Sequence, residues 1–159
     1  MNKRVLSWIL ILALLLGVYP LGAVAAQTFQ DVKPGMYYYD PVLWAVENEI
    51  TNGVSATLFA PENVCTRDQI VTFLWRAQGR PEPRSSANPF SDVKNGEYYF
   101  KAVLWAVEQN ITNGMSEHLF GPAEPCTRAQ VATFLWRAAG KPKASASNPF
   151  SDVKSGTYY

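Results

Sequence analysis

The sequence predicts a mostly α-helical protein built from tandem helix–loop–helix repeats. Residues 29–81 align without a gap with residues 90–142, and 33 of these 53 pairs are identical. Within each copy, two apolar segments follow the period of an α-helix. A third copy begins at residues 150–154, where FSDVK repeats the FSDVK of residues 90–94. One such unit cannot bury its apolar face alone, so the units are expected to pack against each other.

The N-terminal segment, residues 1–26, reads as a signal peptide. Lys3 and Arg4 precede an apolar run at residues 5–21, and the small residues GAVAA follow. An uncleaved anchor is the alternative, but the small residues favour cleavage. Cleavage removes two positive charges and changes the formal net charge from +1 to −1. A chain with so little net charge is not expected to bind nucleic acid, and membrane contact is expected only through this segment.

Two segments rich in Pro, Ser, Ala and Asn read as exposed linkers between the copies. The predicted organisation is therefore a signal peptide at 1–26, repeat 1 at 27–82, a linker at 83–89, repeat 2 at 90–143, a linker at 144–149 and the start of a truncated repeat 3 at 150–159.

The first helix of repeat 1 is predicted over residues 40–48 (DPVLWAVEN). Asp40 can cap this helix, and Pro41 suits its first helical position. The sequence ITNG follows the first helix in both copies and indicates a turn. We expect Gly53 and Gly114 to adopt a positive φ there, and a glycine also lets a ligand approach the backbone.

In the second helix of each copy, sequence motifs mark both the first and the last turn. Thr66 and Gln69 form a capping-box pattern, and Thr127 and Gln130 repeat it. In each pair, the threonine hydroxyl can accept from the glutamine N–H, and the glutamine side chain can reach back to the threonine N–H. A glycine followed by proline then ends each helix, at residues 79–81 and 140–142.

The order of these motifs resembles the S-layer homology (SLH) domain, and the resemblance covers residues 29–142 and the start of the third copy. It implies a pseudo-threefold, mostly helical spindle, here with an incomplete third repeat. It also implies a module on the bacterial cell surface or S-layer that binds secondary cell-wall polymer, often through pyruvylated sugars, in grooves between repeats. No cofactor is implied. The family's Thr-Arg-Ala-Glu motif reads TRDQ at residues 66–69 and TRAQ at 127–130.

Arg67 and Arg128 are the strongest candidates for glycan binding. An arginine at a helix N-terminus does not complement the macrodipole, so its occurrence in both copies suggests a ligand. A helix N-terminus and a guanidinium together suit a carboxylate such as that of a pyruvyl group. The alternative is a structural ion pair with Asp31 or Asp92 of a neighbouring repeat.

Other repeated residues are further candidates. Trp44 and Trp105 suit the apolar face of a sugar ring, although tryptophan in such a helix more often belongs to the core. Asp31 and Asp92 suit sugar hydroxyls, or they hold a turn through backbone N–H groups.

Cys65 and Cys126 stand at equivalent positions, just before the capping threonines. A disulfide is one interpretation for an exported chain. Equivalent positions in separate repeats are usually far apart, however, and the family has an aliphatic residue there, so we predict two buried thiols. No metal site is predicted, because there is no C-x-x-C motif and His118 is the only histidine.

The sequence favours a non-enzymatic anchor. Glu47 and Glu108 could be imagined as an acid–base pair, but their recurrence in each repeat fits a structural role better than a single active site. Two alternatives stay open. In the first alternative, the chain is the anchor of a larger surface enzyme whose catalytic domain lies beyond residue 159. In the second, it is a self-associating repeat without glycan binding.

Overall fold

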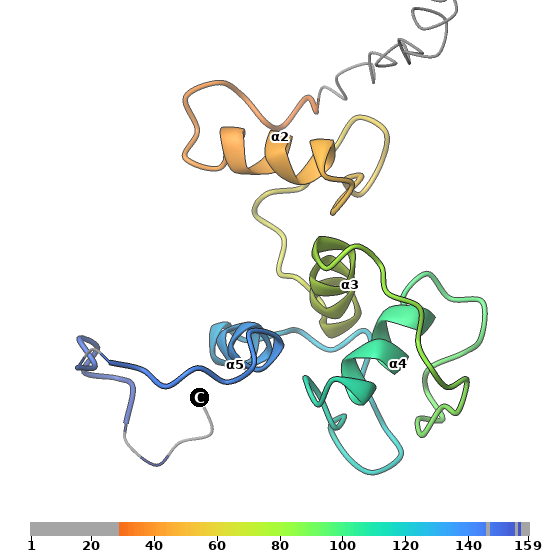
Figure 1. Ribbon diagram of the computed structural model, residues 1–159. Helices are drawn as coiled ribbons and strands as arrows, with labels where there is room; N and C mark the ends of the chain where they lie inside the picture. Colours follow the sequence, from red (N-terminus) through yellow and green to blue (C-terminus); the bar gives the residue numbers. More distant parts are fainter. Residues whose placement is uncertain (1–28, 146, 155, 157–159) are drawn as a thin grey trace, which may run out of the picture.

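The structure is a computed structural model that describes residues 29–145, 147–154 and 156 (Figure 1). The helices of this part are α2 (Tyr39–Glu47), α3 (Arg67–Ala77), α4 (Phe100–Glu108) and α5 (Arg128–Ala138). Tandem helical repeats are therefore confirmed. None of these helices has the length and apolar character needed to cross a bilayer. The predicted signal peptide lies outside the described residues.

The first helix of repeat 1 begins one residue earlier than predicted, and Asp40 is not its cap. The N-cap is Tyr38, which makes no side-chain capping hydrogen bond, and Asp40 lies inside the first turn. The backbone itself starts the helix, because the N–H of Tyr39 donates to the carbonyl of Met36 at 3.0 Å. Pro41 also lies in the first turn, where its missing N–H has no intrahelical partner to lose.

The capping boxes predicted for the second helices are confirmed in both α3 and α5. Thr127 N–H donates to Gln130 Oε1 at 2.9 Å, and Gln130 N–H donates to Thr127 Oγ1 at 3.2 Å. In α3, Thr66 N–H donates to Gln69 Oε1 at 3.0 Å, and the Gln69 N–H donates to Asp68 Oδ1 at 2.8 Å. Asp68, which repeat 2 lacks, therefore adds a carboxylate acceptor to the capping box of α3.

Helix packing runs between repeats. The second helix of repeat 1, α3, packs against α4 and α5 of repeat 2, whereas α2 packs against no other helix of the described part (Figure 1). The main core lies around α3, α4 and α5, and it includes Val71, Val103, Trp105, Ile111, Phe120 and Phe134. A smaller core holds the first half of repeat 1 together, and it consists of Phe29, Val32 and Val42. Each repeat thus covers its neighbour.

Gly53 and Gly114 adopt positive φ values of +74° and +82°, as predicted, and they are also closely packed. A Cβ on Gly53 would lie 2.6 Å from the carbonyl oxygen of Leu58 and would overlap the ring of Phe29. Gly114 meets the equivalent atoms of Phe90 and Leu119. The ITNG turn therefore needs glycine both for its backbone conformation and for its packing.

Substitution Gly53→Ala is expected to lower the free energy of unfolding by about 2 kcal/mol or more, because left-handed strain and a steric clash add. Gly35→Ala is the matched control, since Gly35 has φ +89° and a Cβ at this position would have no atom within 4 Å. Urea denaturation of both variants checks this. Equal losses would show that packing against Phe29 contributes nothing.

Candidate functional site

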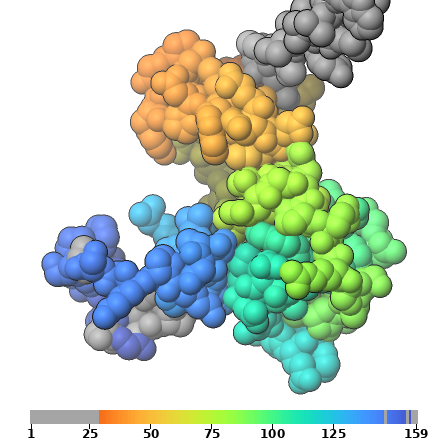
Figure 2. Space-filling model, viewed as in Figure 1, coloured from red at the N-terminus to blue at the C-terminus, as the bar shows by residue number. Residues whose placement is uncertain are grey.

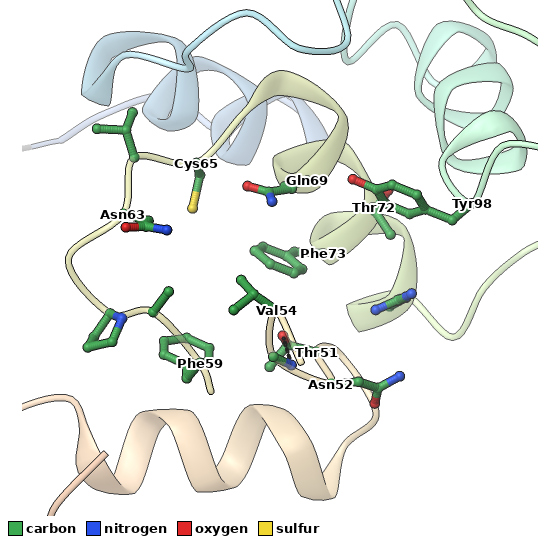
Figure 3. Close-up of a pocket in the computed structure, with 15 residues that line it drawn as sticks. Thr51, Asn52, Val54, Phe59, Asn63, Cys65, Gln69, Thr72, Phe73 and Tyr98 are labelled. Carbon is green, nitrogen blue, oxygen red and sulfur yellow. Dashed lines mark hydrogen bonds between the residues drawn. The ribbon is translucent and has the colours of Figure 1, made fainter. Parts of the chain in front are cut away.

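Two grooves lie at equivalent positions of the two repeats. The first groove is a cavity of about 520 Å³ between the loop that follows α2 and one face of α3 (Figure 3). The second groove is a cavity of about 260 Å³. The first is lined by residues that include Thr51, Gly53, Gln69, Thr72, Arg76 and Tyr98, and the second by Arg67, Thr112, Gly114, Gln130, Thr133 and Arg137. The repeats therefore present the same polar groups to two hollows.

Arg67 belongs to repeat 1 but lies in the second groove, against repeat 2. Figure 2 shows that the surfaces of the two repeats are in contact. Its side chain is only 4% exposed, and its Nε donates to the carbonyl of Phe120 at 2.9 Å. The guanidinium carbon lies 5.0 Å from the centroid of the Phe120 ring and 5.4 Å from that of Phe134. Arg67 therefore joins the repeats and places positive charge at the wall of the second groove.

Arg128 is the sequence equivalent of Arg67, yet the structure places it differently. Its side chain is exposed at the N-terminus of α5. The difference follows from the order of the repeats, because Arg67 is covered by a loop of the next repeat. For Arg128, the covering loop would belong to the third copy. Two equivalent motifs thus give one buried and one exposed arginine.

Asp31 and Asp92 accept hydrogen bonds from backbone N–H groups and so hold loops in place. This is the structural role that the sequence analysis gave as the alternative to binding sugar hydroxyls. Asp31 accepts from the N–H groups of Phe59 and Ala60 at 3.0 and 2.7 Å. Asp92 accepts in the same way from Phe120 and Gly121, at 2.9 and 2.7 Å. The carbonyl of Phe120 also accepts a hydrogen bond from Arg67. Asp92 and Arg67 therefore hold the backbone N–H and the backbone carbonyl of the same residue.

The hydrogen bond from Phe59, followed by the one from Ala60, lowers the pKa of Asp31 below its ordinary value of 3.8. The unfolded chain therefore binds this proton at higher pH than the folded chain does. The ionised Asp31 carboxylate therefore stabilises the folded chain. This stabilisation is fully present above the pKa that Asp31 has in the unfolded chain, and it is lost as the pH falls through the pKa that Asp31 has in the folded chain.

We expect the free energy of unfolding to fall as the pH decreases below 3.8, the ordinary pKa of Asp31, and we expect Asp31→Asn to weaken that dependence on pH. Urea denaturation across this range measures both slopes. Asp40→Asn is the control, since Asp40 is an exposed carboxylate in the first turn of α2. An unchanged slope in Asp31→Asn would contradict the expectation.

Tyr98 of repeat 2 reaches the first groove, where it lies beside residues of repeat 1 (Figure 3). Its hydroxyl donates to Asp68 Oδ2 at 2.7 Å. Burial first, and then this hydrogen bond to Asp68, raise the pKa of Tyr98 above its ordinary value of 10.0. The hydroxyl therefore stays protonated at neutral pH and keeps Asp68 in place at the start of α3.

The sequence analysis missed Arg76 and Arg137, which line the two grooves. Arg76 Nη1 donates to the carbonyl of Ile50 at 3.0 Å, and Arg137 Nη1 donates to that of Ile111 at the same distance. The signal was their spacing. Gln69, Thr72 and Arg76 lie at i, i+3 and i+7, on one face of α3, and α5 repeats the pattern.

Thr72 is a third residue that the sequence analysis missed. It is 1% exposed, and its hydroxyl has no hydrogen-bond partner within the described part of the chain. It lies on the wall of the first groove (Figure 3). Because a buried hydroxyl without a partner is unfavourable, the groove offers a ligand or water a bond there.

The structure separates the two candidate tryptophans. Trp105 is 6% exposed and belongs to the main core, so its ring faces are closed to a sugar. The proposal of glycan contact is therefore wrong for Trp105. Trp44, at the equivalent position of α2, is 57% exposed. The reason is that α3 covers α4, whereas no described helix covers α2.

The sulfurs of Cys65 and Cys126 are not bonded to each other in the structure, but the expectation that the repeats keep the two residues far apart is wrong. The N–H of Cys126 donates to the carbonyl of Cys65 at 2.9 Å. The adjacent pair Thr66 and Pro125 forms an isolated antiparallel bridge. The segments that lead into α3 and α5 therefore run side by side.

Glu108 has a structural role. Its carboxylate accepts from the backbone N–H groups of Arg84 and Ser85 at 3.0 and 2.9 Å, which fixes the linker onto α4. These hydrogen bonds, that of Arg84 first, lower the pKa of Glu108. A carboxyl group held in its charged form is poorly suited to act as a general acid. Within the described ranges, no three His, Cys, Asp or Glu side chains lie close enough to bind a metal ion.

Comparisons with known proteins agree with this architecture. The chain matches the S-layer homology domain over residues 28–71 and 89–132. It is 34% identical over 144 residues to an endoglucanase of Bacillus sp. (strain KSM-635), an alignment that covers 86% of this chain and 15% of the relative. It is 33% identical over 113 residues to the surface-layer 125 kDa protein of Lysinibacillus sphaericus, and this alignment covers 69% of this chain and 10% of the relative.

A third relative is the cellulosome-anchoring protein of Acetivibrio thermocellus, which is 30% identical over 88 residues, or 54% of this chain and 20% of the relative. The chain thus spans no more than about a fifth of the length of these relatives. Two matched segments, at the spacing of the internal repeat, account for more than half of the chain. The chain therefore belongs to the S-layer homology domain family, whose members are exported proteins of the bacterial cell surface.

Proposed function

We propose that this chain anchors an exported protein to the bacterial cell wall without a covalent bond, by binding secondary cell-wall polymer in the grooves between its repeats. The observation that carries the proposal is the pair of equivalent grooves with the same polar lining. Family membership and the surface proteins among its relatives support the same role.

The lining of the grooves suits an anionic sugar. The second groove has two guanidinium groups on its wall, from Arg67 and Arg137, and the hydroxyls of Thr112 and Thr133. Guanidinium groups bind carboxylates through directed, charge-assisted hydrogen bonds, and a pyruvylated sugar carries such a carboxylate. A pyruvylated glycan is therefore the ligand class that we assign to these grooves.

Each groove also takes a residue from the neighbouring repeat. Repeat 2 supplies Tyr98 to the first groove, and repeat 1 supplies Arg67 to the second. A third repeat placed in the same way would bring an equivalent arginine to the first groove. It would also bring a tyrosine equivalent to Tyr98 to the second. Tyr158, the counterpart in the third copy, lies outside the described residues.

Binding to purified sacculi tests the function. The mature chain is expected to sediment with intact sacculi and to stay in solution once the secondary polymer has been extracted from them. Retained binding to the extracted sacculi would overturn the proposal, because peptidoglycan alone would then be the receptor.

Charge substitutions at Val54 test the site. Val54 is exposed and lies on the wall of the first groove, so its replacement does not disturb the core. Val54→Asp is expected to weaken binding to sacculi, because a carboxylate there repels an anionic glycan, whereas Val54→Lys should keep or strengthen it. Both variants expose the same position with opposite charge, so equal binding by the two would exclude the first groove as an anion site.

The relatives suggest a place for this chain within a longer product. Several are named as enzymes, among them an endoglucanase and an exoglucanase, and the chain matches only a small part of each. We infer that the anchor attaches a separate domain, encoded beyond residue 159, to the wall. The genomic reading frame downstream of Tyr159 tests this directly.

Self-association is a second candidate function, favoured by two uncovered helix faces. Trp44 on α2 is 57% exposed, while Leu135 and Trp136 on α5 are 52% and 45% exposed. Trp105 on α4 is equivalent to Trp44, and Leu74 and Trp75 on α3 are equivalent to Leu135 and Trp136. These equivalent residues belong to the contact between the repeats. The free face of α5 in one copy therefore complements the free face of α2 in another.

Light scattering of the mature chain tests this second candidate. Wild type is expected to associate with rising concentration, and Trp44→Glu should stay monomeric. Tyr37→Glu, at an even more exposed aromatic side chain that precedes α2, is the control. A monomeric wild type would exclude self-association without affecting the sacculus experiment.

A further inference from the structure

We propose that Cys65 and Cys126 form a disulfide bond in the exported protein and that this bond links repeat 1 to repeat 2. The bond would close a loop between positions 61 residues apart, which contains most of repeat 2. The proposal is independent of glycan binding, since it concerns only how the repeats are held together.

The backbone geometry carries the proposal. The Cys126 N–H donates to the Cys65 carbonyl at 2.9 Å, and the Arg67 N–H donates to the Glu124 carbonyl at 3.0 Å. These two hydrogen bonds flank the antiparallel bridge between Thr66 and Pro125. In that register, Cys65 lies directly opposite Cys126.

Residues directly opposite each other in an antiparallel pair have their Cα atoms about 4.5–5.5 Å apart, with both side chains on the same side. A disulfide needs Cα atoms about 4.4–6.8 Å apart. The two ranges overlap, so the backbone does not have to move far. In Figure 3 the sulfur of Cys65 points into the first groove, and the bond therefore requires a rotation of this side chain about its Cα–Cβ bond.

The surroundings favour a stable bond over a reactive thiol pair. Cys126 is buried in the main core, and Cys65 is half-buried. Burial raises the pKa of the Cys65 thiol, and burial is also the largest cause that raises the pKa of the Cys126 thiol, against a smaller opposing effect of the Arg67 charge. Few thiolates exist in the folded chain at neutral pH, so once formed during folding the bond exchanges slowly.

The chemistry is a thiol–disulfide exchange with an oxidant of the disulfide class, such as a low-molecular-weight disulfide outside the cell. The two cysteine sulfurs lose two electrons and two protons as their S–S bond forms. The S–S bond of the oxidant breaks, and its two sulfurs leave as thiols that carry those protons. An exported protein meets such oxidising conditions, whereas a cytosolic one does not.

Mass spectrometry of the secreted, unreduced mature chain tests the proposal. We expect an intact mass lower than that of the reduced chain by two hydrogen atoms and no alkylation by iodoacetamide under denaturing conditions. A tryptic digest should contain one species that joins the peptide ending at Arg67 to the peptide ending at Arg128, and reduction should separate them. Two alkylated thiols, or chains linked to each other in place of the internal link, would overturn the proposal.

Thermal unfolding gives a second measurement. The oxidised chain is expected to melt about 10 °C above the reduced chain, because the closed loop restricts the unfolded state. Cys65→Ser and Cys126→Ser should each melt near the reduced wild type and show no dependence on reductant. A reductant-dependent shift that persists in either variant would show that the two thiols are not bonded to each other.

Discussion

Replacement of Trp105 with alanine is expected to lower the free energy of unfolding by about 3–5 kcal/mol. The side chain is 6% exposed and packs in the core that joins α3 to α4, so its loss leaves a cavity at the contact between the repeats. Urea denaturation followed by tryptophan fluorescence or circular dichroism measures the change. Because the contact joins two repeats, the variant is also expected to unfold in separate steps.

Trp44→Ala is the matched control, since the repeat places the same residue at the same position of α2. We expect a loss of about 1 kcal/mol or less, because 57% of this side chain already faces solvent. Equal losses in the two variants would mean that α2 is covered in solution, by a second copy or by a further repeat. Concentration dependence of the Trp44→Ala effect would distinguish these two cases.

Arg67→Ala is expected to lower the free energy of unfolding by about 2–4 kcal/mol and to weaken binding to sacculi. The substitution removes the hydrogen bond to the Phe120 carbonyl and the stacking of the guanidinium on Phe120 and Phe134. It also removes positive charge from the second groove. Denaturation and sacculus binding of the same preparation measure the two effects separately.

Arg128→Ala is the control for stability, because its side chain is exposed and α5 begins without its help. We expect a change within about 0.5 kcal/mol in unfolding. If both arginines bind the ligand, Arg128→Ala also weakens binding to sacculi, and the double variant binds least. Unchanged binding in a folded double variant would exclude both arginines from the site.

Local structure could be predicted from the sequence where neighbouring residues determine it. The capping residues of α3 and α5, the glycine at position 140 and the positive φ of Gly114 all follow from side chains within a few positions. The first helices were predicted less well. Their N-caps are backbone turns, so Asp40 resembled a cap without acting as one.

The candidate site could be predicted only in part, because the grooves combine residues from two repeats. Arg67 was identified from its motif, but its contact with Phe120 depends on a residue 53 positions away. Arg76 was missed, since its role depends on the carbonyl of Ile50, which lies 26 positions away in the chain. Neither contact has a local signature in the sequence.

The sequence by itself determined the repeat, its helices and its family, because each of these depends on spacing and on residues near in the chain. Only the tertiary structure decided which of two identical residues is buried. Trp105 and Arg67 are buried in the junction between the repeats, whereas Trp44 and Arg128 lie outside this junction and are exposed. The physical reason is that each helix pair is completed by the next repeat, so equivalent residues of the two repeats have different neighbours.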